Sequence, residues 1–555
     1  MAVRLTQLQV VSPDDYAARG VAQRLRAIVL PAERGSIFDR NGSELAMSVR
    51  RHTVWADPRL VTDPEGAADA LAPVLGVDHE VLVRRLGGSG AFVYLSRQVD
   101  ADVAETVSSL GLDGVSLLDE SHRFTPAGSL AASVLGTVDI DNQGTAGLEL
   151  VYEDRLVGVP GELILERGPG GRTIAAGEHR LSPAERGDDL VLTIDRSLQY
   201  EVERALGDQI LATGAAGGSA IVMDPRTGEI LALANLRADA AGGPPRPSRD
   251  NMAVTTLFEP GSVSKVVVAA AALEEGLYTP EQTWEVPPAV QVSVKRFSDE
   301  HPRSGPSSFT DVITRSSNVG TIQIGQALGP ERVDAYLRRF GFGQSTGLGF
   351  PGESNGILLD LDEWTGPSIG SISIGQGIAV NALQMLGAFN AIANDGVLVT
   401  PTLVRSTLDA DGTEHLADRS PRRRVISAAS AEQMRAILTN VVASTEGTGQ
   451  RAQIAGYSVA GKTGTARKPS RTHRGYEEGA YVATFAGFVP AEDPQLSAIV
   501  VLDEPSPYYA SLTSAPVFGG ISRYALRLLR IPPSATPIVE PPVVVDPDTI
   551  VVPRD

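Results

Sequence analysis

Two β-hairpin patterns lie on either side of a long helical stretch, and this arrangement limits the folds open to the chain. The first pattern covers 219–223 and 229–233, two β-rich runs joined by a turn that contains Pro and Gly. The second covers 481–489 and 496–502. Mostly helical sequence, including 382–394, lies between the two hairpins. Strands at both ends with helices between them predict one α/β domain whose antiparallel sheet is completed by both ends of its sequence.

The length of 555 residues provides for two or three domains. Residues 1–190 are rich in Gly and Pro turn signals, with short strand-like alternating segments, and we expect them to form a scaffold or docking module. Residues 191–530 contain the predicted α/β domain. Residues 531–555 hold seven prolines and no helical pattern, which predicts an extended tail or linker.

One helix of the first region has recognisable ends. Asp63 is a good N-cap, and Pro64 suits the first helical position. Alanines and a leucine supply an apolar face up to Ala72. Pro73 is expected to stop the helix there, because proline has no N–H to donate.

Composition excludes several classes of function. The 48 Lys and Arg against 67 Asp and Glu give a net charge of −19, which argues against nucleic acid as a partner. The chain has no cysteine, so thiol catalysis, cysteine-ligated clusters and disulfides are excluded. No metal or cofactor is expected. The longest apolar run, Val266–Leu273, is far shorter than the ~20 residues of a spanning helix, and nothing at Met1 resembles a signal peptide.

The first of three short motifs in the α/β region pairs a serine with a lysine. Ser262 follows a Pro-Gly pair and precedes an apolar helical run, so it is expected at a helix N-terminus, where negative charge is favoured. Lys265 is three residues further on, which places both side chains on one helix face. A serine needs a base, and no histidine lies near this motif. We therefore expect Lys265 to be that base, with its pKa lowered from ~10.4 by burial and by a second cation, for which Lys462 is the candidate.

The second and third motifs supply polar groups for a substrate. In Ser316-Ser317-Asn318, Ser316 is expected to relay a proton between Lys265 and a leaving amine. The amide of Asn318 is suited to holding a substrate peptide group. In the third motif, Lys462-Thr463-Gly464-Thr465, an ammonium and two hydroxyls suit a terminal carboxylate, and glycine allows a substrate backbone to come close. The backbone N–H groups of Thr465 and Ser262 are candidates for an oxyanion hole.

Each motif alone has an ordinary structural interpretation. The first fits an N-cap serine beside a surface lysine, the second a capped turn, and the third a strand end with a solvated lysine. Three matches in this order are much harder to obtain by chance. Together they favour a serine acyl-transferase that acts on peptides ending in D-alanine.

With these motifs the chain resembles the penicillin-binding proteins, and among them the class B, monofunctional transpeptidases. The similarity covers essentially residues 1–530 and extends to segments outside the three motifs. These segments are Arg34–Gly42, Gly147–Glu149, Gly158–Gly161, Ser373–Gly377 and Thr445–Gly449.

The resemblance implies a fold and a reaction. The fold is a five-stranded antiparallel sheet flanked by helices, with an all-helical subdomain, on an elongated α+β N-terminal pedestal of the dimerisation type. The reaction is D,D-transpeptidation of peptidoglycan stem peptides that end in D-Ala-D-Ala, without a cofactor. Ser262 would attack the penultimate D-alanine, the terminal D-alanine would leave, and an amine of a neighbouring stem would attack the acyl-enzyme. β-Lactams would acylate Ser262.

Within the family, three segments are most similar to the division-associated members. They are Ala56–Pro58, Phe92–Arg97 and Asp195–Gln199. Septal synthesis is therefore expected, with a polymerising glycosyltransferase and divisome proteins as partners. The family usually carries one N-terminal membrane helix, and Met1–Leu5 resembles the stretch that follows such a helix. We expect a membrane-anchored protein with an extracytoplasmic catalytic domain.

Other functions remain open at this point. An elongation-type transpeptidase has the same chemistry. A D,D-carboxypeptidase or a serine β-lactamase has the same motifs, although no Glu-x-x-Leu-Asn segment lies between Asn318 and Lys462. A non-catalytic β-lactam sensor would need a signalling segment that is not found here. A silent scaffold is disfavoured because every expected catalytic residue is present.

Overall fold

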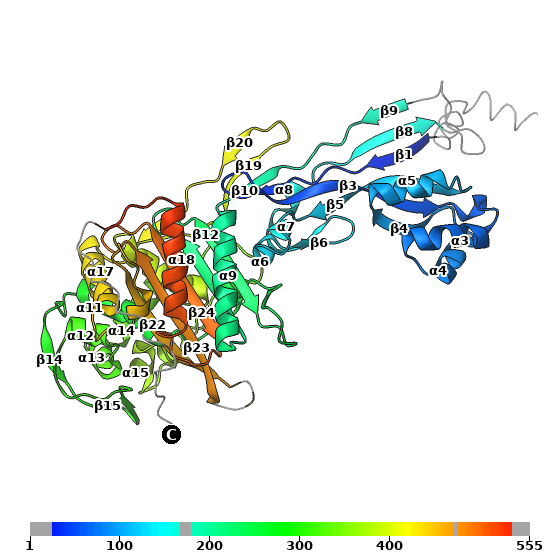
Figure 1. Ribbon diagram of the computed structural model, residues 1–555. Helices are drawn as coiled ribbons and strands as arrows, with labels where there is room; N and C mark the ends of the chain where they lie inside the picture. The colour runs from blue at the N-terminus through cyan, green and yellow to red at the C-terminus, as the bar shows by residue number, and fades with distance from the viewer. Residues whose placement is uncertain (1–24, 167–178, 471, 473–474, 535–555) are drawn as a thin grey trace, which may run out of the picture.

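The computed structural model describes residues 25–166, 179–470, 472 and 475–534. An α/β body built around one antiparallel sheet holds the three motifs. A long pedestal of extended strands leads away from this body and ends in a small head with helices α3, α4 and α5 (Figure 1). The molecule is therefore elongated, with the head far from the α/β body. The C-terminal tail predicted for 531–555 lies outside the described residues from 535 onward.

The sheet of the α/β body is formed by both ends of that region, as predicted. Strand β11 pairs antiparallel with β24, so that Gly217 lies opposite Asp503. The sheet has five main strands and a sixth, two-residue strand at one edge. The order is β13 (Arg246–Pro247), β12 (Ile230–Arg237), β11 (Gly217–Met223), β24 (Leu496–Asp503), β23 (Tyr476–Val489) and β22 (Ala460–Pro469).

Helices cover both faces of this sheet. On one face, α9 (Arg196–Thr213) and α18 (Ser514–Leu528) pack in a core with the strands (Figure 1). On the other face lie α11 (Lys265–Glu274), α16 (Ala382–Ala393) and α17 (Ala428–Ala443). Each face of a strand thus buries alternate apolar side chains. Among the described helices, none combines the length and the apolar composition needed to cross a bilayer.

Helix α11 is the centre of the helical subdomain. All of its residues from Lys265 to Leu273 are buried, which is typical of a helix that is apolar on every side. The subdomain also contains four further helices and two small two-stranded sheets. They are α12 (Phe309–Thr314), α13 (Asn318–Leu328), α14 (Pro330–Arg339), α15 (Ser368–Ser373), the pair β14 (Thr283–Val286) and β17 (Gly305–Ser308), and the pair β15 (Ala289–Val292) and β16 (Lys295–Ser298).

The pedestal contains a seven-stranded sheet that draws on distant parts of the chain. Strand β19 (Val404–Leu408), from within the predicted α/β region, pairs antiparallel with β10 (Asp189–Leu192). Its hairpin partner β20 (Glu414–Leu416) extends this edge. The other strands are β2 (Ile37–Phe38), β3 (Glu44–Ala56), β4 (Val93–Val99) and β5 (Val115–Phe124). A separate three-stranded sheet is formed by β1 (Leu25–Leu30), β8 (Gly161–Glu166) and β9 (His179–Ser182).

The head is inserted between β3 and β5 and has its own apolar core. Its helices are α3 (Pro64–Leu75), α4 (His79–Leu86) and α5 (Ala101–Ser109). Helix α3 begins as predicted, since the Asp63 side chain accepts from Gly66 N. The predicted end at Ala72 is wrong, because Pro73 lies inside the helix and Gly76 ends it in a left-handed conformation. Proline at this position costs the helix one hydrogen bond, from the backbone nitrogen of residue 73 to the carbonyl of Asp69. The loss is small because Asp69 is exposed and Pro73 lies in the last turn of the helix.

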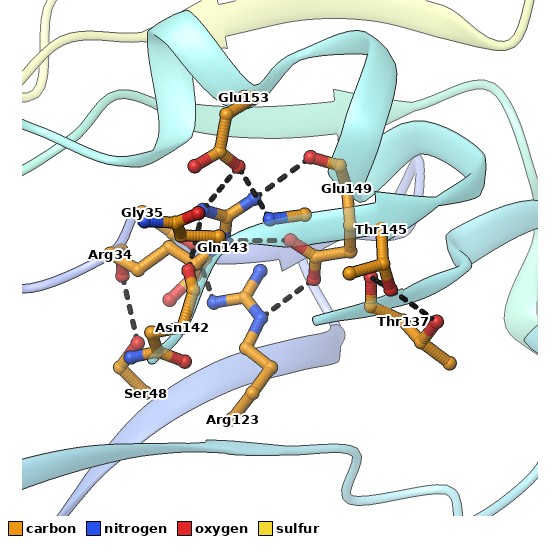
Figure 2. A network of polar contacts seen from close by, with 12 residues as sticks. Arg34, Gly35, Ser48, Arg123, Thr137, Asn142, Gln143, Thr145, Glu149 and Glu153 are labelled. Carbon is orange, nitrogen blue, oxygen red and sulfur yellow. Dashed lines mark hydrogen bonds and ion pairs between the residues drawn. The ribbon is translucent and has the colours of Figure 1, made fainter. Parts of the chain in front are cut away.

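A buried ionic network joins the strands of the pedestal to its short helices. Arg34 is 1% exposed, and its guanidinium contacts Glu149 at 2.7 Å and Glu153 at 2.7 Å. Arg123 contacts the other carboxylate oxygen of Glu149 at 2.7 Å (Figure 2). Arg34 precedes β2, Arg123 lies on β5, and the two acids belong to α7 (Gly147–Val151) and α8 (Glu153–Leu156). Two of the family-like segments, 34–42 and 147–149, thus meet in this network.

Candidate active site

The first motif forms a tight turn that runs into α11. Gly261–Ser264 is a 3₁₀ turn, and Lys265 begins the α-helix. Ser262 is half-buried and lies in this turn, directly before the helix. Ser264 is buried, and its hydroxyl donates to the Gly261 carbonyl at 2.8 Å, which closes the turn. Ser262 therefore lies on a rigid support at the N-terminal end of a buried helix.

The second motif is a turn between two helices. Helix α12 ends at Thr314, and Ser316 then adopts a positive φ of 61°, which is uncommon for serine. Ser317 is the N-cap of α13, with its hydroxyl accepting from Gly320 N at 3.0 Å. Asn318 is the first residue of that helix. The turn presents the Ser316 carbonyl and the Asn318 side chain on one side.

Lys265 joins the first two motifs. Its Nζ donates to the Ser316 carbonyl at 2.7 Å and to Asn318 Oδ1 at 2.7 Å, and it lies 3.4 Å from Ser316 Oγ. The side chain is 0% exposed. The structure thus brings together Lys265, Ser316 and Asn318, which are up to 53 residues apart in the sequence.

The third motif lies within β22 and packs against the first. A Cβ at Gly464 would lie 2.4 Å from Val263 Cγ2 and 3.0 Å from the Pro260 carbonyl. Glycine is therefore required there by the turn that carries Ser262, a neighbour that the sequence did not indicate. Thr463 Oγ1 lies 2.7 Å from Thr448 Oγ1, and Thr465 is half-buried.

Lys462 is more deeply placed than a solvated strand-end lysine. It is 0% exposed, and its Nζ donates to the Thr463 carbonyl at 3.2 Å. A carboxylate that binds at this strand would therefore meet the hydroxyls of buried Thr463 and half-buried Thr465, on the same strand as the buried Lys462. This arrangement keeps the Lys462 amine close to the site and out of contact with bulk water.

Burial lowers the pKa of both lysines. The pKa of Lys265 falls to about 7, because desolvation penalises the ammonium, while the carboxylate of Asp299 acts in the opposite direction. The pKa of Lys462 is lowered well below its usual range, first by burial and then by repulsion from Lys265. Lys265 can therefore gain or lose a proton near neutral pH, as a general base must.

Two residues at the site were not identified from the sequence. Asp299 accepts hydrogen bonds from the turn of the second motif, and Thr448 contacts the third motif. The sequence shows Thr448 only as part of a family-like segment, and it marks Asp299 in no way. The aspartate reaches α13 from the segment that follows β16, about 20 residues earlier, and no local pattern predicts such a contact.

Comparisons with known proteins agree with this architecture. Residues 29–192 match the penicillin-binding protein dimerisation domain, and residues 218–523 match the penicillin-binding protein transpeptidase domain. Penicillin-binding protein PbpB of Mycolicibacterium smegmatis is 33% identical, over 97% of this chain and 89% of the relative. Peptidoglycan D,D-transpeptidase FtsI of Escherichia coli is 33% identical, over 96% of this chain and 90% of the relative.

Solved structures share the fold over nearly the whole chain. Penicillin-binding protein 3 of Mycobacterium tuberculosis, complexed with ampicillin, gives a TM-score of 0.72 at 32% identity and covers 92% of this chain and 98% of its own. A peptidoglycan synthetase of Bifidobacterium adolescentis gives 0.75 at 30% identity, over 94% and 100%. The chain therefore belongs to the class B penicillin-binding proteins of the FtsI type, the family of the peptidoglycan D,D-transpeptidases.

Proposed function

We propose that this protein is a D,D-transpeptidase that cross-links peptidoglycan stem peptides through an acyl-enzyme on Ser262. The observation that carries the proposal is the buried Lys265 Nζ, held at 2.7 Å by both the Ser316 carbonyl and Asn318 Oδ1. A neutral amine has two N–H groups and one lone pair. These two acceptors take the two N–H groups, so the lone pair is left for the proton of Ser262.

The proton moves in a closed cycle. Ser262 Oγ attacks the carbonyl carbon of the penultimate D-alanine as its proton passes to Lys265 Nζ. Ser316 Oγ, 3.4 Å from that nitrogen, passes the proton to the amine of the terminal D-alanine as the C–N bond breaks. An amine of a second stem then attacks the ester carbonyl, loses its proton to the site and releases Ser262. The product is a new amide bond, and no cofactor enters the balance.

The substrate is held between α13 and β22 in this proposal. One N–H of Asn318 Nδ2 donates to the Ser298 carbonyl at 3.2 Å, and the other is left for a peptide carbonyl of the donor stem. The Thr465 and Ser262 N–H groups receive the oxyanion. Thr463 and Thr465 bind the terminal carboxylate above the buried Lys462. A donor peptide amidated at its C-terminus tests this role. It should acylate the enzyme far more slowly than the free acid, and equal rates for both donors would contradict the assignment.

A fluorescent penicillin tests the nucleophile. A β-lactam ring carries the strained amide that Ser262 opens, and the ester should be stable enough for detection by gel and by intact mass. Ser262→Ala should abolish the label, while Ser197→Ala, at an exposed position of α9 on the other face of the sheet, should keep it. A label that persists in Ser262→Ala, or that is released within seconds as by a β-lactamase, would contradict the proposal.

We infer further that the protein acts at the division septum, anchored in the membrane with its catalytic domain outside. The FtsI-type relatives and the wall-peptide chemistry support this, because the polymeric substrate exists outside the membrane. A polymerising glycosyltransferase and divisome proteins are the expected partners. A fluorescent fusion should gather at mid-cell, whereas even labelling along the side wall would favour an elongation role.

A further inference from the structure

The turn that carries Ser316 and Asn318 is held by a carboxylate from another part of the chain. Asp299 follows strand β16 and is half-buried. Its Oδ2 accepts from Ser317 Oγ at 2.7 Å, and its Oδ1 accepts from Asn318 N at 2.5 Å and Val319 N at 3.0 Å. The two backbone N–H groups are the first of α13, where a helix has no partner of its own and favours negative charge.

The segment that presents Asp299 is itself fixed in place. Phe297, two residues earlier, is 6% exposed and packs in a small core with Ile322 of α13 and Ile374. The carbonyl of Ser298 accepts from Asn318 Nδ2 at 3.2 Å. Ser298 and Asp299 therefore contact the Asn318 side chain and backbone together. These contacts tie the β15–β16 hairpin to the second motif.

Both short acceptors of Lys265 belong to the turn that Asp299 holds. One is the carbonyl of Ser316, whose φ of 61° is sterically unfavourable for a serine and persists only where the surroundings enforce it. The other is Oδ1 of Asn318, whose own N–H is bound by Asp299. If the carboxylate is removed, Ser317 Oγ and the first N–H groups of α13 lose their acceptor, and the turn is free to relax away from Lys265.

We propose that Asp299 is a positioning residue for the acylation reaction, which holds the Ser316–Asn318 turn in register with Lys265 and places one negative charge near its amine. Asp299 does not touch the substrate or the reacting atoms. The inference rests on the proposed role of Lys265 as the base. It adds a residue that lies outside the three motifs and that none of the family-like segments contains.

The charge of Asp299 has a consequence that a purely structural role would not have. Asp299 favours the ammonium of Lys265 against the desolvation caused by burial, and Lys265 in turn disfavours a second positive charge on Lys462 of β22. Lys265 must be neutral to take the proton of Ser262, so acylation increases as pH rises through its pKa. Loss of the negative charge makes the ammonium less favourable. The acidic limb of the rate profile should therefore move to lower pH.

The experiment compares Asp299→Asn and Asp299→Ala with the parent protein, by the second-order rate constant of acylation with a fluorescent penicillin from pH 5 to pH 9. The plateau rate should fall about tenfold in Asp299→Asn and about 100-fold in Asp299→Ala. The limb of Asp299→Asn should move down by about half a pH unit. Asp311→Asn is the matched control, because Asp311 caps α12 through Ser308, at the far end of the helix before the turn. It should leave the limb in place.

The outcomes separate this inference from the proposed function. If the parent is not labelled at Ser262, the proposed function fails. If the parent is labelled and both Asp299 variants match its rate and its limb, the positioning role is overturned. A slower Asp299→Asn with an unmoved limb, or the same shift in Asp311→Asn, overturns the electrostatic part. Asp299→Asn keeps the size and one acceptor oxygen, so it remains informative if Asp299→Ala does not fold.

Discussion

Lys265 is the residue on which the proposed chemistry depends, because it is completely buried and has a pKa near neutrality. A lysine in water is an acid that holds its proton up to pH ~10.4. Burial within α11 removes that preference, while Asp299 restores part of it. The sequence predicted that burial would lower the pKa of Lys265, whereas the predicted contribution of Lys462 is not seen, because the repulsion between the two lysines lowers the pKa of Lys462 instead. The sequence did not indicate the opposing carboxylate, because Asp299 reaches the site only through the folding of the β15–β16 hairpin.

Acylation by penicillin should rise with pH through about 7, the pKa of Lys265, and then level off. Below that pH the amine is protonated and cannot accept the proton of Ser262. Lys265→Arg keeps a cation that does not deprotonate, so its rate should fall by about 1,000-fold or more at every pH. Stopped-flow fluorescence with a labelled penicillin measures the rate for the parent and for Lys265→Arg. An Arg variant within a few-fold of the parent would place the base elsewhere.

At the scale of elements, the strands next to strong turn signals were predictable and the supports of the active site were not. The hairpins β11–β12 and β23–β24 lie where the alternating runs and their Pro-containing turns predicted them. The end of α3 was missed because Pro73 is tolerated in a last turn. The loop 373–377 was notable only as a family-like segment. In the structure it packs on the Ser262 turn, with the Gly375 carbonyl accepting from Gly261 N at 3.0 Å.

Gly375→Ala should slow acylation strongly, whereas Gly377→Ala should not. Both glycines have a positive φ, 77° and 75°, so the backbone strain of alanine is the same. A Cβ at Gly375 would lie 2.2 Å from the Gly261 carbonyl oxygen and 2.3 Å from Ser264 Oγ, while Gly377 has open space. We expect a loss of about 100-fold at Gly375, since the turn with Ser262 must shift. Equal effects in both variants would mean that strain alone is responsible.

The buried ionic network of the pedestal is expected to stabilise the packing of its strands against its short helices (Figure 2). Arg34→Leu leaves Glu149 and Glu153 with one guanidinium fewer in a buried site, which should cost about 3–5 kcal/mol of the pedestal's stability. Calorimetry should show the loss as a lower melting temperature. Arg59→Ala removes an exposed arginine of the head, outside this network, and should leave the melt unchanged. An Arg34→Leu protein that melts with the parent would show that the network does not stabilise the fold.

The whole molecule separates a catalytic body from a distant head, yet one sheet crosses between its parts. Strands β19 and β20 come from the α/β region and complete the sheet of the pedestal. No local pattern in 404–416 predicts this pairing. The sequence of a strand indicates which of its faces is buried, but it does not indicate which distant strand lies beside it. The connection of the two regions through β10 and β19 was therefore not predictable from the sequence.

The head should be dispensable for acylation and required for position in the cell. Ala56 and Val115 are paired across β3 and β5, so residues 57–114 can be replaced by an Asn-Gly turn that closes the hairpin. Strand β3 keeps β5 as its partner from Met47 to Ala56. Ser262 lies in the α/β body at the other end of the molecule (Figure 1), so penicillin labelling of the shortened protein should stay within about twofold of the parent.

The same shortened protein, made as a fluorescent fusion, should lose its accumulation at mid-cell. The head carries exposed aromatic side chains that suit a protein partner, among them Phe92 and Tyr94, which are 47% and 42% exposed. A fusion of the full chain at equal expression is the control. Loss of labelling in a variant that still melts cooperatively would mean that the head supports the active site. If the shortened protein still accumulates at the septum, the docking surface lies on the three-stranded sheet of β1, β8 and β9 or on the α/β body.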